Sequence, residues 1–386
     1  MTHAVIAGYV RTPFHFARKG RLKDSRPDDL AALVLRALVD RSGLDPLLIE
    51  DVLFGCAYPE AAQGNNIGRI ASLLAGLPKE LGGATMNRFC GSSMYAIHVA
   101  AGQIAMGAGD AFIAGGVESM TMVPQGGFNF SPNPRFAFDG QPGTDQFYDA
   151  YISMGQTAEN VAARHGIARE DQEQLAVDSH AKAARAQADG LLAGEIVPVV
   201  LADGSRVEED GCIRAGTSLE VLAGLKPAFA EDGSVTAGTA SPLTDGAVAT
   251  LVTSDAFAAK HGLPVLARIR ASAVAGVEPE YMGMGPVPAT RKALARAGLS
   301  VDDLDVVEIN EAFGSQAVAC INELRIPREL VNIDGGALAL GHPLGATGAR
   351  ITGKAAQILN RSGGRYALAT QCIGGGQGIA TILEAV

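Results

Sequence analysis

The sequence predicts an α/β fold made of two similar halves, with a long insertion in the first half. Three observations carry this prediction. Short apolar runs alternate with segments of helical spacing, the order of these elements repeats at a fixed offset along the chain, and one stretch of the first half has no counterpart in the second. At 386 residues the chain also exceeds what one hydrophobic core normally covers, so two or three structural units are expected.

The first half begins with an apolar strand over 4–10, followed by a helix over 30–44 with apolar residues at helical spacing and Gly43 at its end. The remaining predicted elements of this half are a strand over 51–56, helices over 67–75 and 92–106, and a strand over 111–115. The second half repeats this order, with strands expected over 305–309 and 366–369.

Three anchors share an offset of 255: Gly43 with Gly298, Cys90 with Gly345, and 110–114 with 365–369. Beyond the insertion, the segment starting at Gly246 matches the segment starting at Gly378 at an offset of 132. The chain therefore divides into a first half over 1–118 and 246–264, an inserted loop domain over 119–245, and a second half over 265–386.

The inserted domain is rich in Pro, Asn, Asp and Gly and carries one strong amphipathic helix over 170–188. A loop-rich insertion of this size is expected to act as a cap over an active site.

The composition excludes several classes of protein. With 47% apolar and 19% charged residues the chain is globular, and a net charge of −10 argues against a nucleic-acid-binding surface. The five cysteines have no zinc-type spacing, so we expect no metal site and free thiols in a reducing compartment. Charge appears by Arg11, too early for a signal peptide, and the chain is expected to be cytoplasmic.

The stretch over 89–109 carries no formal charge and is long enough to span a bilayer. It contains repeated glycines, several polar residues and no run of large aliphatic residues, so membrane insertion is not expected. The preferred interpretation is a helix that is apolar all round and buried in the middle of a layered protein.

Cys90 is the sharpest candidate for chemistry, because it directly precedes this uncharged helix. The positive end of the helix dipole favours a thiolate, which suits a nucleophile. A buried structural cysteine is the alternative.

His342 lies three residues before the position that the repeat equates with Cys90. If the halves pack about a pseudo-twofold axis, His342 approaches Cys90 and can activate the thiol. The alternative is a loop histidine that caps a turn.

Cys372 and Asn310 both follow predicted strands of the second half, where catalytic groups tend to collect. The glycines after Cys372 allow backbone N–H groups to approach an oxyanion. The alternatives are a core cysteine at a strand end and an Asx cap of the next helix. GxxxxGK at 348–354 lacks the Ser or Thr of a phosphate loop, and no GxGxxG follows the first strand, so no nucleotide cofactor is expected.

Taken together, these residues resemble the thiolase family over essentially the whole chain, with greatest similarity to its degradative 3-ketoacyl-CoA members. Four ordered motifs carry the resemblance: NRFCGSSM at 87–94, NEAF at 310–313, GHPLGATGAR at 341–350 and CIGGGQG at 372–378. RTPF at 11–14 and VTAGTAS at 235–241 also match.

The resemblance implies a five-layered α-β-α-β-α sandwich with an inserted loop domain. It also implies that Cys90 is the acylated nucleophile, His342 its base, and Cys372 the acid or base acting on the acetyl α-carbon. One oxyanion hole would use His342 and a water held by Asn310, and a second would use the N–H groups of Cys90 and Gly374.

Coenzyme A would be a co-substrate rather than a bound cofactor, and the inserted domain would bind it. The resemblance places Arg214 near the adenine, Phe229 and Ser241 along the pantetheine, and Met154 at the acyl site. Ser153 stands where short-chain biosynthetic members often have histidine, and with Ser93 it favours thiolysis.

The implied function is thiolytic cleavage of 3-ketoacyl-CoA in fatty-acid β-oxidation, by a homodimer or homotetramer with a possible multienzyme partner. Acetoacetyl-CoA and 3-oxoadipyl-CoA are alternative substrates. A ketoacyl synthase and a non-catalytic lipid-carrier relative are alternatives of other kinds, and Cys372 speaks against the first.

Overall fold

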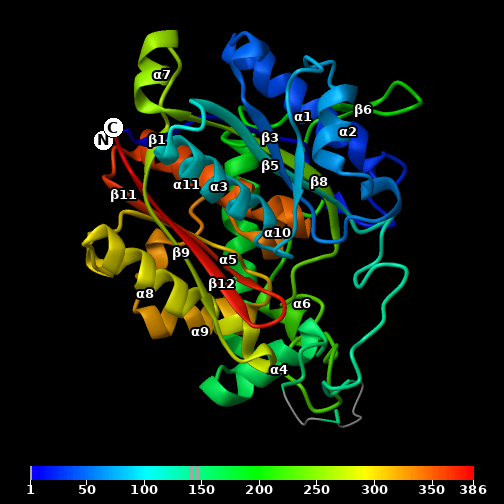
Figure 1. Ribbon diagram of the computed structural model, residues 1–386. Helices are drawn as coiled ribbons and strands as arrows, with labels where there is room; N and C mark the ends of the chain where they lie inside the picture. Colours follow the sequence, from blue (N-terminus) through cyan, green and yellow to red (C-terminus); the bar gives the residue numbers. More distant parts are fainter. Residues whose placement is uncertain (1, 139–142, 145–147) are drawn as a thin grey trace.

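Ten strands form one mixed sheet that crosses both halves of the chain (Figure 1). The computed structural model describes residues 2–138, 143–144 and 148–386. The strand order is β10-β11-β12-β9-β1-β8-β5-β3-β4, with β2 paired to β8. The strands of the first half are β1 (Ala4–Arg11), β2 (His15–Phe16), β3 (Asp51–Gly55), β4 (Ala84–Met86), β5 (Ala111–Ser119) and β8 (Thr244–Ser254). Those of the second half are β9 (Ala267–Gly276), β10 (Val306–Ile309), β11 (Tyr366–Ile373) and β12 (Gln377–Glu384).

The two halves have the same topology, which confirms the duplication. In the first half β3 and β5 are parallel and β5, β8 and β1 are antiparallel neighbours; β10, β11, β12 and β9 repeat this pattern. Asp51 pairs with Phe112 in the parallel ladder of the first half, and Val306 pairs with Ala367 in that of the second. Each residue of the second pair lies 255 positions after its counterpart in the first, the offset that the sequence anchors share.

After the insertion, the register differs by one position from the match of Gly246 with Gly378. Ala111 faces Thr253 in one antiparallel ladder, and Tyr366 faces Glu384 in its counterpart. A match of short apolar runs tolerates a slip of one residue, whereas a ladder does not, because one step turns every side chain to the other face of the sheet.

Helices cover and separate the two half-sheets, giving the five layers α-β-α-β-α. The outer layer of the first half contains α1 (Pro27–Ser42) and α2 (Ile67–Leu74), and that of the second contains α8 (Pro286–Ala297) and α9 (Gly314–Leu324). Between the half-sheets lie α3 (Ser92–Met106) and α11 (Leu344–Ser362), which pack on each other and on strands of both halves.

Equivalent signals end equivalent helices in the two halves. Helix α1 has Pro27 in its first turn and ends at Gly43, whose φ of 65° is left-handed, and α8 ends at Gly298 with φ of 72°. Glycine adopts this conformation without the steric cost that other residues bear, so the matched glycines fix where both helices stop.

Helix α3 has the predicted bounds but is not buried all round. Met94, Ile97 and Ile104 are buried, whereas the Met106 side chain at the C-terminal end is 84% exposed. The helix lies at the margin of the central layer, where α11 covers one flank only (Figure 1). An uncharged sequence has no polar stripe to mark such an outward face.

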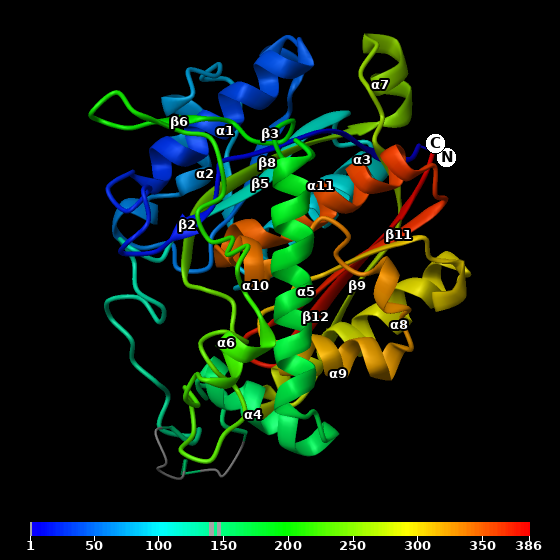
Figure 2. The same cartoon turned by 180° about the vertical axis from the view of Figure 1, so that it is seen from behind.

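Between β5 and β8 the chain forms α4 (Met154–His165), α5 (Arg169–Ala188), β6 (Val199–Val200), β7 (Arg206–Val207) and α6 (Leu219–Ala223). Helix α5 packs on α9 and on α10 (Ala337–Leu340), and Figure 2 shows it running along the back of the molecule. Helix α7 (Asp255–His261) follows β8. In the described part of the chain no helix has the length and apolarity needed to cross a bilayer.

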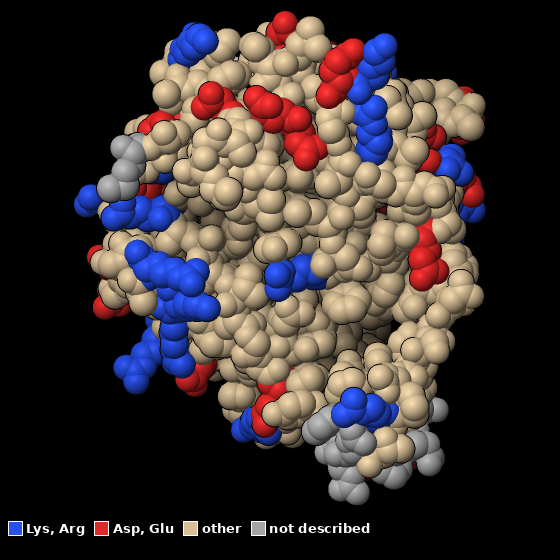
Figure 3. Space-filling model, in the orientation of Figure 1, with Lys and Arg blue, Asp and Glu red and all other residues tan. Residues whose placement is uncertain are grey.

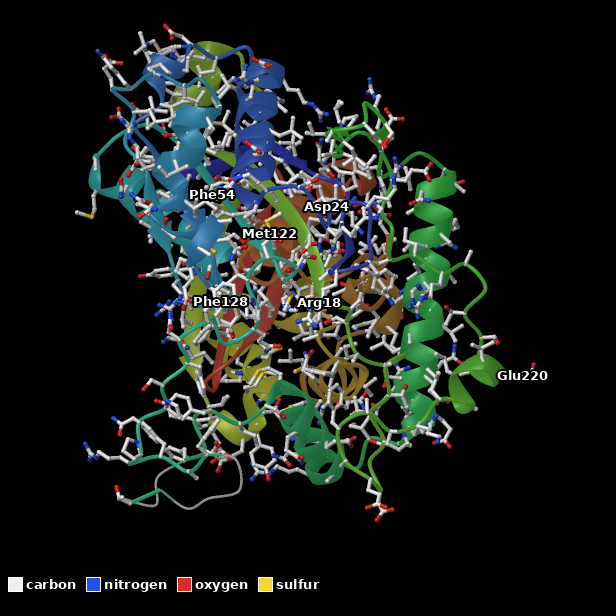
Figure 4. The ribbon with its side chains drawn as sticks, turned by 90° about the vertical axis from the view of Figure 1, so that its right-hand side faces the viewer. Arg18, Asp24, Phe54, Met122, Phe128 and Glu220 are labelled. Carbon is white, nitrogen blue, oxygen red and sulfur yellow. The ribbon has the colours of Figure 1, made fainter. Side chains whose placement is uncertain are left out.

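The segment after β5 returns over the first half before it reaches α4. The N–H of Arg18 donates to Thr121 Oγ1 at 2.6 Å, and the N–H of Phe128 donates to Glu60 at 2.9 Å. Figure 4 shows Arg18, Met122 and Phe128 in this region and Glu220 of α6 at the rim.

Candidate active site

Cys90 sits in a tight turn that the polar residues of its own motif hold. Asn87 Oδ1 accepts from the N–H of Phe89 at 2.9 Å, and Ser92 Oγ accepts from Arg88 N and donates to Phe89 O. Phe89 has a φ of 42°, a left-handed conformation that is unusual for an aromatic residue. The turn therefore carries backbone strain directly before the candidate nucleophile.

The Cys90 thiol is not acidic, and the expectation from the helix dipole is wrong. Burial raises its pKa to about 11, and the negative charge of Glu118 adds to the rise, although the N–H of Gly374 near the sulfur lowers it. Loss of hydration outweighs the first turn of α3, because the dipole corresponds to only about half an elementary charge. At neutral pH the thiol is protonated and needs a base.

His342 is buried and neutral. Burial lowers its pKa to about 3, and the nearby positive charge of Arg350 lowers it further. Nδ1 lies 2.6 Å from Thr347 Oγ1, which is within 3.4 Å of the Pro343 carbonyl oxygen. Since the Thr347 hydroxyl donates to that carbonyl, it accepts from Nδ1–H, and Nε2 keeps its lone pair.

Asn310 lies next to His342. Its Nδ2 lies 3.4 Å from His342 Nε2, as expected for a donor facing a lone pair, and its N–H donates to the Thr370 carbonyl. Its Oδ1 is buried and has no hydrogen-bond partner among the described residues. Asn310 does not cap the next helix, since the N-cap of α9 is Phe313.

Cys372 lies inside β11, which extends to Ile373, well beyond the predicted strand end. Burial raises the pKa of this thiol well above its ordinary value, and negative charge on Cys90 or Cys320 would raise it further. The side chain of Gln371, the residue before Cys372, donates to the Cys90 carbonyl oxygen, so the segments that carry the two candidate thiols are in contact.

The turn between β11 and β12 meets the Cys90 turn. The N–H of Gly374 points at the Cys90 sulfur, and Gln371 Nε2 donates to the Cys90 carbonyl oxygen. Gly375 and Gly376 have φ of 77° and 81°, conformations that glycine adopts readily. The second half thus supplies a backbone donor beside a side chain of the first.

The candidates for coenzyme A binding are spread over a wider area. Met154 begins α4 near Gly374, where an added Cβ would lie 3.5 Å from the Met154 sulfur, and Met154 packs in one apolar cluster with Cys372. The Phe229 ring, 41% exposed, stands edge-on to Phe313 at 5.9 Å.

Ser241 and Arg214 make different contacts. The N–H of Ser241 donates to the Ala312 carbonyl, which keeps it next to the NEAF segment. The guanidinium of Arg214 is 5.1 Å from the centre of the Phe16 ring, and the backbone N–H of Arg214 donates to His180 Nδ1.

Four residues around Cys90 and His342 are not among the candidates from the sequence: Thr347, Gln371, Tyr58 and Glu118. Thr347 stands five residues after His342 inside the same motif, a spacing that could have suggested a partner for Nδ1. Gln371 directly precedes Cys372, but nothing in the sequence predicts its contact with Cys90.

The comparisons with known proteins show the family of the chain. Residues 4–256 match the model of the thiolase N-terminal domain and residues 263–385 that of the C-terminal domain. The chain is 47% identical to a 3-ketoacyl-CoA thiolase of Shewanella denitrificans and to a 3-oxoadipyl-CoA/3-oxo-5,6-dehydrosuberyl-CoA thiolase of Escherichia coli, with 100% of each chain covered.

The crystal structure of the Bacillus anthracis acetyl-CoA acetyltransferase superposes with a TM-score of 0.90 at 39% identity, covering 100% of this chain and 99% of that one. The two domain models together span nearly the whole chain, and the full-length relatives share close to half of its residues. These matches leave one assignment: the chain belongs to the thiolase family.

Proposed function

We propose that this thiolase cleaves 3-ketoacyl-CoA with coenzyme A, releasing acetyl-CoA and an acyl-CoA shortened by two carbons. The observation that carries the proposal is the meeting of the two halves. Cys90 of the first half meets the turn after β11 of the second half, where the N–H of Gly374 faces its sulfur and Gln371, next to Cys372, donates to its carbonyl oxygen. The second half also provides His342, which is buried and neutral.

The first step acylates Cys90. His342 Nε2 takes the thiol proton, the sulfur attacks the 3-keto carbon, and the carbonyl oxygen becomes an oxyanion. Two donor sets are available: the new Nε2–H with a water on the unpartnered Asn310 Oδ1, and the backbone N–H of Gly374 with that of Cys90. One donor of this kind contributes about 3–4 kcal/mol to transition-state stabilisation.

The second step breaks the C2–C3 bond. The electron pair stays on C2 of the departing acetyl-CoA, and Cys372 donates its proton to that carbon. A thiol whose pKa is raised by burial suits this transfer, because a weakly acidic group holds its proton until the carbanion forms.

The third step releases the shortened acyl group. The thiolate of Cys372 takes the proton of coenzyme A, whose sulfur attacks the acyl-cysteine, and the departing Cys90 thiolate recovers its proton from His342. Coenzyme A is therefore a co-substrate. We propose that Met154, Phe229, Ser241 and Arg214 bind it, with Met154 nearest the acyl group.

A second candidate is cleavage of 3-oxoadipyl-CoA, because a relative that carries this name is as similar as the 3-ketoacyl-CoA thiolase. The surroundings of Cys90 favour an uncharged acyl chain. Cys90 packs against an apolar cluster of four buried side chains, Ala17, Ala57, Met120 and Leu344. A terminal carboxylate next to such a cluster would lose hydration without a paired charge.

Steady-state thiolysis of a substrate panel tests the proposal. We expect unbranched 3-ketoacyl-CoA longer than acetoacetyl-CoA to give the highest kcat/KM, measured by chromatographic release of acetyl-CoA. A higher kcat/KM for 3-oxoadipyl-CoA would favour the second candidate, and turnover of none would point to a lipid carrier.

We further propose that the enzyme is a cytoplasmic homo-oligomer. Strand β4 ends the sheet path with no neighbour on its outer side among the described strands, and the exposed end of α3 is uncharged. Figure 3 shows that the face around α3 carries few charged groups. Open strand edges and uncharged surfaces are typical of interfaces between subunits.

Light scattering is expected to give two or four times the chain mass of 39.6 kDa. Replacement of the exposed Met106 by glutamate should weaken assembly, whereas the same change at Leu47, 62% exposed outside α3, should not. A monomeric wild-type protein would contradict the proposal.

A further inference from the structure

Glu118 is a buried carboxylate close to Cys90 that the proposed steps do not use. It lies near the end of β5, and its residue surface is 1% exposed. Both oxygens are fully engaged. Oε1 accepts from Tyr58 N at 3.2 Å, from Gln63 Nε2 at 2.9 Å and from the Cys56 thiol at 3.6 Å.

The other oxygen joins the two halves of the molecule. Oε2 accepts from the N–H of Ala57 in the first half and from the N–H of Gly345 in the first turn of α11, at 2.8 Å and 2.9 Å. A Cβ on Gly345 would lie 2.8 Å from Oε2 and 2.7 Å from the Cα of Cys56, so only glycine permits this approach. A single carboxylate atom therefore sets the spacing of both segments.

Both segments lead directly to the reacting groups. The Tyr58 ring lies 6.1 Å from the Phe89 ring, centre to centre, and Tyr58 packs with Cys90 on the same apolar cluster. Gly345 follows His342 by three residues. The distance between Ala57 and Gly345 is therefore the spacing between a segment that packs near Cys90 and the segment that carries His342.

The donor set also identifies the charge state. Four of the five partners of Glu118 are N–H donors and the fifth is the Cys56 thiol, a set that an ionised carboxylate satisfies more fully than a protonated one. Burial raises the pKa of Glu118, and the N–H groups of Ala57, Gly345 and Tyr58 oppose that rise. These three donors and the start of α11 offset part of the loss of hydration.

We infer that Glu118 is a positioning residue for the proposed thiolase reaction: its carboxylate holds the Tyr58 segment and the first turn of α11 at a fixed spacing across the junction of the halves. The inference rests on the proposed function for its kinetic consequence. Its structural part, the bridge between Ala57 and Gly345, is independent of the substrate.

The variant Glu118→Gln tests the inference, because it keeps the shape of the side chain but replaces one acceptor oxygen by an N–H₂ group that faces donors. We expect kcat to fall on the order of 100-fold with KM nearly unchanged, as for a displacement of about 1 Å at reacting groups. We also expect faster amide hydrogen exchange confined to 56–58 and 343–346.

The rate at which iodoacetamide alkylates Cys90 is a second measurement. A loss of stability alone would not change how this rate depends on pH. The titratable groups that interact with this thiol are Glu118, Tyr58 and Cys372. The negative charge of Glu118 raises the pKa of Cys90, so Glu118→Gln should be alkylated faster at mildly alkaline pH. Glu118→Asp keeps the charge and should react as the wild type does, but with lowered kcat.

The matched control is Asp210→Asn, which removes another buried carboxylate, bound to Arg11 and to the N–H of Phe14. It should lower the melting temperature without altering exchange at 343–346 or the alkylation profile.

A folded Glu118→Gln variant with kcat within about twofold of the wild type, or with unaltered exchange at both segments, would overturn the inference. If that variant does not fold, Glu118→Asp decides by the same two measurements. A wild-type protein that cleaves no 3-ketoacyl-CoA would instead refute the proposed function, and the exchange and alkylation measurements would still test the bridge.

Discussion

Alanine in place of Cys90 eliminates the acyl-enzyme and, with it, thiolytic turnover. The C–C cleavage as proposed needs a covalent bond between the enzyme and the 3-keto carbon, and no other described thiol has the same combination of partial exposure, a facing Gly374 N–H and an apolar acyl surface. We expect kcat to fall on the order of 10⁴- to 10⁶-fold, as when a nucleophile is removed from a coupled set of catalytic groups.

Mass spectrometry of the intact protein after incubation with 3-ketoacyl-CoA, without free coenzyme A, measures the effect. The wild type should gain the mass of one acyl group and Cys90→Ala should gain none. Cys212→Ala is the control, because it also removes a thiol with a raised pKa, about 12, but from a site not assigned to the reaction. An acyl adduct on the Cys90→Ala protein would exclude Cys90 as the nucleophile.

Alanine in place of Cys372 separates acylation from C–C bond chemistry. The variant retains Cys90, His342 and the Gly374 N–H, so an activated acyl thioester should still acylate it. It lacks the proton donor for C2, and removal of a general acid lowers the rate by about 10²- to 10⁴-fold. Both thiols are protonated at neutral pH because burial raises the pKa of each, so Cys372 holds the proton that the departing carbanion requires.

Two measurements on the same Cys372→Ala preparation check this result. Mass spectrometry should show the acyl adduct from the activated thioester, and the assay with 3-ketoacyl-CoA should show little acetyl-CoA. Full turnover by the variant would refute the assigned role, and loss of the adduct as well would indicate that the alanine disturbs Cys90 rather than proton transfer.

Much of the fold follows from local properties of the sequence. The left-handed glycines at 43 and 298 end equivalent helices, and the apolar runs at 51–55 and 306–309 form equivalent strands, because turn chemistry and apolar periodicity act over a few residues. The internal repeat then sets the order of the strands in each half, since equal patterns of elements fold into equal sheets.

The site residues are visible as motifs, but their properties depend on neighbours remote in sequence. The position of Cys90 before α3 predicts a thiolate, yet burial dominates its pKa, and burial is set by segments from both halves. The tautomer of His342 depends on Thr347. Which end of α3 is exposed depends on how α11 packs against it.

By itself the sequence determined the duplicated α/β framework, the family and the residues able to do chemistry, because these depend on periodicity and on residue type at short spacing. The tertiary structure alone decided protonation states and register across the junction. Hydration, charge and hydrogen bonding at the junction depend on residues that are remote in the sequence. Glu118 and Gly345, for example, are 227 positions apart in the chain, yet the N–H of Gly345 donates to Glu118 Oε2 at 2.9 Å.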